Sequence, residues 1–199
     1  MAMNLLSDQV DKKEIEVIVR ELKRVIDNGI KGDIVEFGCY VGTTSVYLAK
    51  NLMADGDKKR LFVYDSFQGL PEKTREDTSP LGESFKPGEL FVAKKQFIKN
   101  MAQAKVTMPQ IKKAWFSDLT EADVPKKIAF AFLDGDYYAS ISDPLKLIEK
   151  QLEIGATLIV DDYANSALPG AAKAVDEWLR LHPTYLKKVE QSLAVIHIR

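Results

Sequence analysis

Apolar residues along the chain alternate between helical spacing and short continuous runs. Helical spacing predicts amphipathic helices over residues 10–28, 44–52, 89–103, 141–152 and 169–182. Between them, apolar runs rich in β-branched residues predict strands buried on both faces, at 33–37, 61–65, 128–133 and 156–160. A weaker strand is predicted at 111–116. Two short strands, at 185–189 and 193–198, finish the chain. This alternation predicts one α/β domain over residues 1–199, with 1–30 as an N-terminal helical segment.

Two of the predicted strands end abruptly in acidic residues. Asp134 follows the 128–133 run, and Asp161 and Asp162 follow the 156–160 run. Their spacing is close to one strand-helix-strand repeat, so we expect these carboxylates at the same edge of the sheet. Clustered carboxylates repel one another unless a cation or protons lie between them, and their oxygens suit Mg²⁺. The alternative is that they only cap turns and bond backbone amides.

A glycine-containing turn, Gly38–Gly42, follows the 33–37 strand and leads into a helix. This order is typical of nucleotide-binding α/β folds. The dinucleotide pattern requires a second glycine where Tyr40 stands, and Glu36 adds a negative charge that disfavours a pyrophosphate. A ligand with adenosine, no phosphate and a cationic end fits better, and S-adenosylmethionine has these features. The alternative is that the glycines serve only turn geometry.

The second predicted strand ends in Asp65, about 20 residues past the glycines, where an acidic side chain accepts hydrogen bonds from ribose hydroxyls. Capping of the next turn is the alternative for this residue. At the end of the third strand, Trp115 and Phe116 are candidates to pack on the adenine, and Ser117 or Asp118 to bond its amino edge. For the two aromatic residues, simple core packing is the alternative.

Residues 68–89 contain prolines, glycines and many charges without periodicity. A loop of this length inside a compact domain is usually functional or disordered. We expect it to form a mobile wall of an acceptor pocket, with plain disorder as the alternative.

Composition narrows the class of protein. The formal net charge of -1 gives no basic footprint for nucleic acid. Cys39 is the only cysteine, so no intrachain disulfide can form, and a reducing compartment is expected. The sequence has no signal-peptide pattern and no run of ~18 apolar residues that would span a membrane. These features favour the cytoplasm.

Several motifs, taken in order, resemble the macrocin O-methyltransferase family. They are residues 35–38 with Gly42, 65–71, 115–118, 133–136 and 160–163. The resemblance implies a seven-stranded, mostly parallel, Rossmann-like class I methyltransferase sheet with helices on both faces, S-adenosylmethionine and Mg²⁺. It also implies that Asp134, Asp161 and Asp162 are the metal ligands.

Two departures qualify what the resemblance implies. The sugar-modifying members are longer, with extra segments over the acceptor. The more distantly similar catechol-type enzymes place a lysine base where this chain has Tyr137. The general base therefore stays open between Asp134, Asp136 and a tyrosine.

We therefore predict a divalent-metal-dependent O-methyltransferase that transfers methyl from S-adenosylmethionine to a hydroxyl of a small sugar or other natural product. Asp134 is the catalytic candidate as well as a metal ligand. The predicted cofactor contacts are Glu36, Gly38, Tyr40, Gly42, Thr44, Asp65, Ser66, Phe116, Asp118 and Asp134. The alternatives are a non-catalytic protein that binds the same cofactor and a nicotinamide-dependent oxidoreductase. The oligomeric state is open, a homo-oligomer included.

Overall fold

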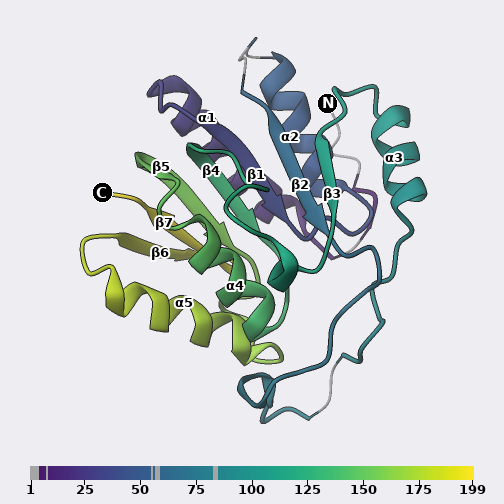
Figure 1. The fold of residues 1–199 in the computed structure, drawn as a ribbon, viewed down its shortest axis with the longest axis vertical. Helices are drawn as coiled ribbons and strands as arrows, with labels where there is room; N and C mark the ends of the chain where they lie inside the picture. The colour runs from purple at the N-terminus through teal and green to yellow at the C-terminus, as the bar shows by residue number, and fades with distance from the viewer. Residues whose placement is uncertain (1–4, 8, 55, 57–58, 83–84) are drawn as a thin grey trace.

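A computed structural model describes residues 5–7, 9–54, 56, 59–82 and 85–199, which form a seven-stranded sheet between two layers of helices (Figure 1). Its strands are β1 (Asp33–Phe37), β2 (Leu61–Asp65), β3 (Gln110–Lys113), β4 (Ile128–Leu133), β5 (Leu152–Val160), β6 (Leu186–Glu190) and β7 (Leu193–His197). Its α-helices are α1 (Lys12–Asp27), α2 (Thr43–Ala54), α3 (Lys94–Gln103), α4 (Tyr138–Ile148) and α5 (Pro169–Leu181). Two 3₁₀ turns, η1 (Arg75–Asp77) and η2 (Phe116–Asp118), lie between them.

The strands run in the order β3-β2-β1-β4-β5-β7-β6. β7 is antiparallel to β5 and β6, and the other neighbouring pairs are parallel. The predicted mostly parallel, seven-stranded class I methyltransferase sheet is therefore confirmed.

The core has two halves, one on each face of the sheet, because successive side chains of a strand point to opposite faces. In β1, Ile34 packs with α1, α2 and α3, whereas Val35 packs with α4 and α5. Both faces of the central strands are thus covered, which explains why their sequences are continuously apolar rather than alternating.

Several predicted boundaries are wrong. The 111–116 strand ends at Lys113, and Phe116 begins a 3₁₀ turn. The 156–160 strand begins at Leu152. The 141–152 helix ends at Ile148, and Gly155 lies inside β5 with a φ of 87°. The β4–β5 pairing has an irregularity in this stretch, where a residue with positive φ is accommodated as in a bulge. The 89–103 helix begins only at Lys94, because Leu90 adopts a φ of 58°. Phe91, which the prediction placed in this helix, precedes it and is 60% exposed.

The long loop (residues 68–89) joins β2 to α3 and extends below the sheet in Figure 1. Its neck is closed by two backbone hydrogen bonds, from Leu70 N–H to the Glu89 carbonyl at 2.8 Å and from Gly88 N–H to the Leu70 carbonyl at 2.9 Å. Farther out, the Ser79 hydroxyl donates to the Ser166 carbonyl. Within its described residues, the loop is therefore fastened to the body of the protein.

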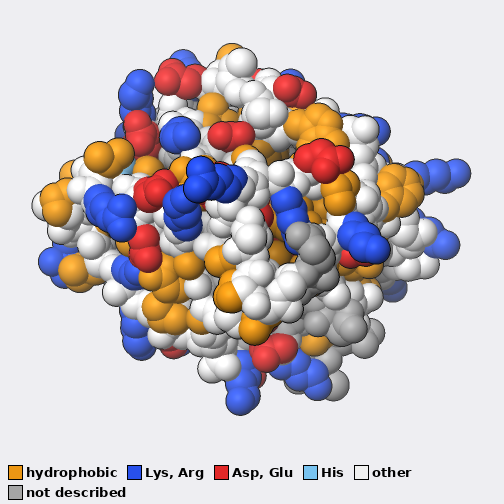
Figure 2. All heavy atoms as spheres, turned by 90° about the horizontal axis from the view of Figure 1, so that it is seen from below, with side chains coloured by type: hydrophobic (Ala, Val, Ile, Leu, Met, Phe, Trp, Pro, Cys, Tyr) orange, Lys and Arg blue, Asp and Glu red, His pale blue; other side chains and the backbone are white. Residues whose placement is uncertain are grey.

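The surface seen from below mixes positive, negative and apolar side chains (Figure 2). No extended area of one charge type lies on the atoms described on this face. Among the described residues, no helix combines the length and apolar character needed to cross a membrane.

Candidate active site

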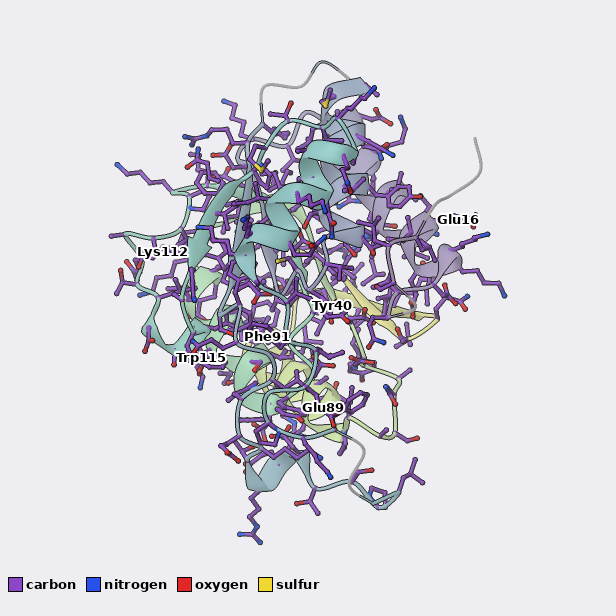
Figure 3. The ribbon with its side chains drawn as sticks, turned by 90° about the vertical axis from the view of Figure 1, so that its right-hand side faces the viewer. Glu16, Tyr40, Glu89, Phe91, Lys112 and Trp115 are labelled. Carbon is purple, nitrogen blue, oxygen red and sulfur yellow. The ribbon has the colours of Figure 1, made fainter. Side chains whose placement is uncertain are left out.

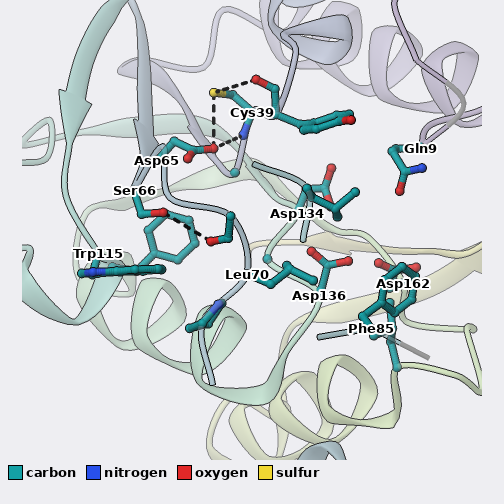
Figure 4. A pocket seen from close by; sticks show the side chains of 18 of the residues that line it. Gln9, Cys39, Asp65, Ser66, Leu70, Phe85, Trp115, Asp134, Asp136 and Asp162 are labelled. Atoms are coloured by element: carbon teal, nitrogen blue, oxygen red, sulfur yellow. Dashed lines mark hydrogen bonds between the residues drawn. The ribbon is translucent and has the colours of Figure 1, made fainter. Parts of the chain in front are cut away.

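A pocket of about 230 Å³ lies where the carboxyl ends of β1, β2, β4 and β5 meet the long loop (Figure 4). This edge is where open α/β sheets bind ligands. One end of the pocket carries Asp65, Ser66 and Trp115, and the other carries three aspartates (Figure 4). The lining residues are Gln9, Gly38, Cys39, Tyr40, Asp65, Ser66, Gly69, Leu70, Pro71, Phe85, Leu90, Ala114, Trp115, Phe116, Asp134, Gly135, Asp136, Asp162, Asn165 and Leu168.

The turn after β1 brings the backbone very close to the end of β4. A Cβ on Gly38 would lie 1.8 Å from the Asp134 carbonyl oxygen, so only glycine fits there, and its φ is 87°. Tyr40 also has a positive φ, 44°. Unusual φ values in non-glycine residues cluster at functional sites, where the surrounding structure holds them.

Asp65 holds this turn from the end of β2. Its Oδ2 accepts the Cys39 N–H at 2.9 Å and the thiol at 3.4 Å, and its Oδ1 accepts the Phe67 N–H at 2.6 Å. Burial, followed by the charge of Asp65, raises the pKa of the Cys39 thiol well above its usual range. Cys39 therefore stays a thiol, and Asp65 fixes two strand ends relative to each other.

The acidic cluster consists of Asp134, Asp136 and Asp162, each of which offers a carboxylate oxygen within 4.8 Å of the others. Asp136 and Asp162 have φ values of 62° and 56°, so the turns after β4 and β5 are both strained. Burial raises the pKa of all three, and the neighbouring carboxylates add to the shifts of Asp134 and Asp136, the latter to about 7. The cluster concentrates negative charge without a cationic side chain among its lining residues.

Asp161, expected as a metal ligand, is not part of this group. Its Oδ1 accepts the Ser192 hydroxyl at 2.7 Å and the Asp162 backbone N–H at 2.7 Å. Burial raises its pKa to about 8, and the charge of Asp162 adds to the shift. The structure thus brings Asp134 and Asp162 together as expected, but Asp136 takes the third place in the group.

Six of the ten predicted cofactor contacts line the pocket: Gly38, Tyr40, Asp65, Ser66, Phe116 and Asp134. Glu36, Gly42, Thr44 and Asp118 do not line it. Asp118 is exposed and Thr44 is buried in α2, while Gly42 leaves room for the Phe97 ring, 2.9 Å from where a Cβ would lie. Four of the expected cofactor contacts therefore lie outside the lining of the pocket.

Glu36 lies behind the pocket as a buried acid. Its Oε2 accepts the Ser45 hydroxyl at 2.5 Å, and its Oε1 has no hydrogen-bond partner among the described residues. Burial raises its pKa to about 8, with a further contribution from Asp65.

Sequence reasoning missed several lining residues. Gln9 and Asn165 carry no recognisable motif, and they reach the acidic end of the pocket from segments far apart in the chain. The apolar wall, which we define as Leu70, Pro71, Phe85, Leu90 and Leu168, was expected only as a loop without named residues. Tyr40 and Trp115 lie on the same side of the molecule as the exposed Phe91, which does not line the pocket (Figure 3).

Residues 7–196 match the family model described as Macrocin-O-methyltransferase (TylF). The chain belongs to this family. The name of this family agrees with the methyltransferase prediction and not with the alternative of a nicotinamide-dependent oxidoreductase.

Two relatives from Streptomyces carry related names. The chain is 30% identical over 165 residues to the 8-demethyl-8-(2,3-dimethoxy-alpha-L-rhamnosyl)-tetracenomycin-C 4'-O-methyltransferase of Streptomyces olivaceus, covering 79% of this chain and 63% of the relative. It is 28% identical over 180 residues to the demethyldecarbamoylnovobiocin O-methyltransferase of Streptomyces niveus, covering 83% and 65%. The chain spans a little under two thirds of the length of both relatives.

Solved structures share the fold. The O-methyltransferase NovP has a TM-score of 0.82 and 24% identity, over 94% of this chain and 80% of NovP. An O-methyltransferase from Bacillus cereus, in complex with SAH, has a TM-score of 0.64 and 15% identity, over 98% and 85% of the two chains.

Proposed function

We propose that the protein is an O-methyltransferase that transfers the methyl group of S-adenosylmethionine to a hydroxyl of a small natural product or sugar, with a divalent cation at the acidic cluster. The observation that carries this proposal is a single pocket that has the glycine-containing turn after β1 at one end and converging carboxylates at the other. Family membership and the names of the two Streptomyces relatives support it.

The cofactor would occupy the end formed by the turns after β1 and β2. Asp65 is the acceptor for ribose hydroxyls, and the half-buried rings of Trp115 and Phe116 are the surfaces for adenine. The bound cofactor supplies an electrophilic methyl group on a sulfonium. Gly38 allows the turn after β1 to approach the end of β4 closely, so that both line the pocket.

A divalent cation fits the acidic cluster. Three half-buried carboxylates with raised pKa values favour a cation that compensates their charge, and carboxylate oxygens match Mg²⁺. Asp134, Asp136 and Asp162 would hold it, and such a cation lowers the pKa of a substrate hydroxyl. Asn165 donates to Asp162 Oδ1 at 2.9 Å and so orients that carboxylate.

The reaction needs one proton acceptor and an aligned hydroxyl. The acceptor oxygen loses its proton and forms the O–CH₃ bond while the C–S bond breaks, and the sulfur keeps the electron pair. Asp134 and Asp136 are the candidates to receive the proton, because both line the pocket at its acidic end. Positioning by the walls contributes to the rate because it replaces the search for an attack geometry.

The walls also indicate the kind of acceptor. Besides the carboxylates, the apolar wall lines the pocket and gives it an apolar surface. A molecule with one or two hydroxyls on an otherwise apolar body would use both surfaces. Its hydroxyls would face Asp134, Asp136 and Asp162, and its body would lie on Phe85 and Leu70.

Calorimetry with S-adenosylhomocysteine tests the cofactor half of the proposal. We expect saturable binding at micromolar concentrations, and no binding at high micromolar concentration would contradict it. A screen with methyl-labelled cofactor, methyl α-L-rhamnoside and catechol then tests methyl transfer. Binding without transfer to any hydroxylated acceptor would favour the alternative of a non-catalytic cofactor-binding protein.

A further inference from the structure

Asp77 is a buried acid in the middle of the long loop, only 3% exposed although its neighbours Glu76 and Thr78 are not buried. Both of its carboxylate oxygens are engaged. Oδ2 accepts the backbone N–H and the hydroxyl of Thr74, each at 2.8 Å, and Oδ1 accepts the backbone N–H of Tyr138 at 2.6 Å. The residue does not line the pocket, so its burial calls for a different explanation.

The bond to Tyr138 places Asp77 at the beginning of α4. The first N–H groups of a helix have no partner within the helix, and Tyr137, at the cap position, provides no side-chain bond. Asp77 supplies the missing acceptor from 61 residues away in the sequence, and its negative charge also suits the positive end of the helix dipole. The helix that it caps starts directly after the turn that carries Asp134 and Asp136.

A third segment closes around the same carboxylate. Gly170, in the first turn of α5, lies so close that a Cβ there would be 1.9 Å from Asp77 Oδ1 and 2.7 Å from the Tyr138 nitrogen. Only a glycine leaves room for this contact. The loop, the start of α4 and the start of α5 therefore meet at one side chain.

The loop that Asp77 fastens also carries most of the apolar wall. Leu70 packs in a small cluster with Tyr137 and Leu168, against which Phe85 and Leu90 are packed. Tyr137 lies between the aspartate turn and α4. Displacing the loop from α4 would thus move the wall relative to the carboxylates.

We propose that Asp77 is a positioning residue for the acceptor: it fixes the apolar wall of the long loop relative to the turn that carries Asp134 and Asp136. It touches neither the acceptor nor the cofactor. This inference rests on the proposed function, because the wall and the carboxylates are taken as the two surfaces that hold the acceptor.

The near-isosteric variant Asp77→Asn tests the proposal. Hydrogen-bond donors face both carboxylate oxygens of Asp77. The NH₂ group of an asparagine must therefore face one set of donors, and the hydrogen bonding on that side is lost. Gly170→Ala should have the same effect with Asp77 intact, because the added methyl group overlaps Oδ1. Glu72→Ala, an exposed acid in the same loop, is the matched control.

The assay compares kinetics with cofactor affinity, using whichever of methyl α-L-rhamnoside and catechol the wild type methylates faster. Asp77→Asn and Gly170→Ala should raise the acceptor KM about tenfold, equivalent to ~1.4 kcal/mol. The S-adenosylhomocysteine Kd should stay within about twofold, because the cofactor end is built by other turns. Hydrogen exchange should become faster both in the loop and at the first turn of α4, and Glu72→Ala should match the wild type throughout.

Several outcomes would overturn the proposal. An acceptor KM at the wild-type value in Asp77→Asn would do so. Parallel losses of cofactor affinity and thermal stability, or a failure of this variant to fold, would also do so, because each indicates a general structural role. Methyl transfer by the wild type with an unaffected Asp77→Asn rejects this inference alone. Absence of transfer by the wild type rejects the proposed function, and this inference with it.

Discussion

The two ends of the pocket are built in different ways. At the cofactor end, the turns after β1 and β2 are short, and Asp65 joins them with hydrogen bonds to Cys39 and Phe67. At the acceptor end, the surface is assembled from Gln9, the long loop and the segment after β5. The difference suggests that the cofactor end is fixed by strand geometry, whereas the acceptor end depends on how distant segments are fastened to it. We expect substitutions at the two ends to separate cofactor binding from acceptor binding.

The largest separation is expected from Asp162→Asn. Removing one charge from the acidic cluster should lower turnover by about 10³-fold, since metal Lewis acidity is worth several kcal/mol. Affinity for S-adenosylhomocysteine should persist, because the cofactor end is intact. Turnover with labelled cofactor and calorimetry measure the two quantities.

Asp161→Asn is the matched control for this experiment. Asp161 bonds Ser192 and lies outside the group of converging oxygens, so its substitution should cost less than about tenfold in turnover. An equal or larger loss in Asp161→Asn would restore the ligand set implied by the family resemblance, Asp134, Asp161 and Asp162.

Gly38→Ala should damage the cofactor end. Its Cβ would overlap the Asp134 carbonyl, and the left-handed φ alone costs about 1–3 kcal/mol for a non-glycine residue. We expect a lowered melting temperature and loss of S-adenosylhomocysteine binding. Gly82→Ala has a similar φ of 93° and open space around it, so it isolates the cost of φ and should keep cofactor binding. Equal effects of the two variants would refute the close approach at Gly38.

Phe85→Ala should act on the acceptor end alone. Loss of this ring from the apolar wall should raise the acceptor KM by about tenfold and leave the S-adenosylhomocysteine Kd unchanged. Phe91→Ala removes an exposed ring that does not line the pocket and serves as the control. A larger effect of Phe91→Ala in steady-state kinetics would place the acceptor outside the pocket.

The last expected effect is on stability rather than on binding, and it concerns Glu36 behind the cofactor end. Its folded-state pKa is raised to about 8 by burial, so its contribution to stability is present at low pH and is lost as the pH rises from its unfolded value toward 8. Glu36→Gln in the cofactor-free protein should therefore gain melting temperature relative to the wild type as the pH goes from 5 to 8. A constant difference over this range, measured by thermal denaturation, would contradict the raised pKa.

Sequence patterns predicted the cofactor end better than the acceptor end, for physical reasons. The turn at Gly38–Gly42 and the acids at the ends of β2, β4 and β5 follow directly from where apolar runs stop, so periodicity alone located them. It could not tell which side of each turn a carboxylate faces. Asp136, considered only as a base, joins the group because its φ of 62° turns the chain after Asp134.

At other positions, contacts between residues far apart in the sequence limited what sequence patterns could predict. Asp77 stands in a loop without periodicity, and nothing near it in the sequence indicates that it caps a helix 61 residues away. The strand predicted at 156–160 begins at Leu152 instead, and the Gly155 N–H in this added stretch donates to the Ile198 carbonyl. Such outcomes depend on tertiary partners, which local propensity does not encode.

Metal dependence of methyl transfer is the most direct test of the account. Wild-type protein is assayed with labelled S-adenosylmethionine and its best acceptor, first in excess chelator and then after Mg²⁺ is added back. We predict that transfer stops in chelator and returns with Mg²⁺, while S-adenosylhomocysteine still binds under both conditions. Unchanged transfer in chelator would contradict a cation held by Asp134, Asp136 and Asp162.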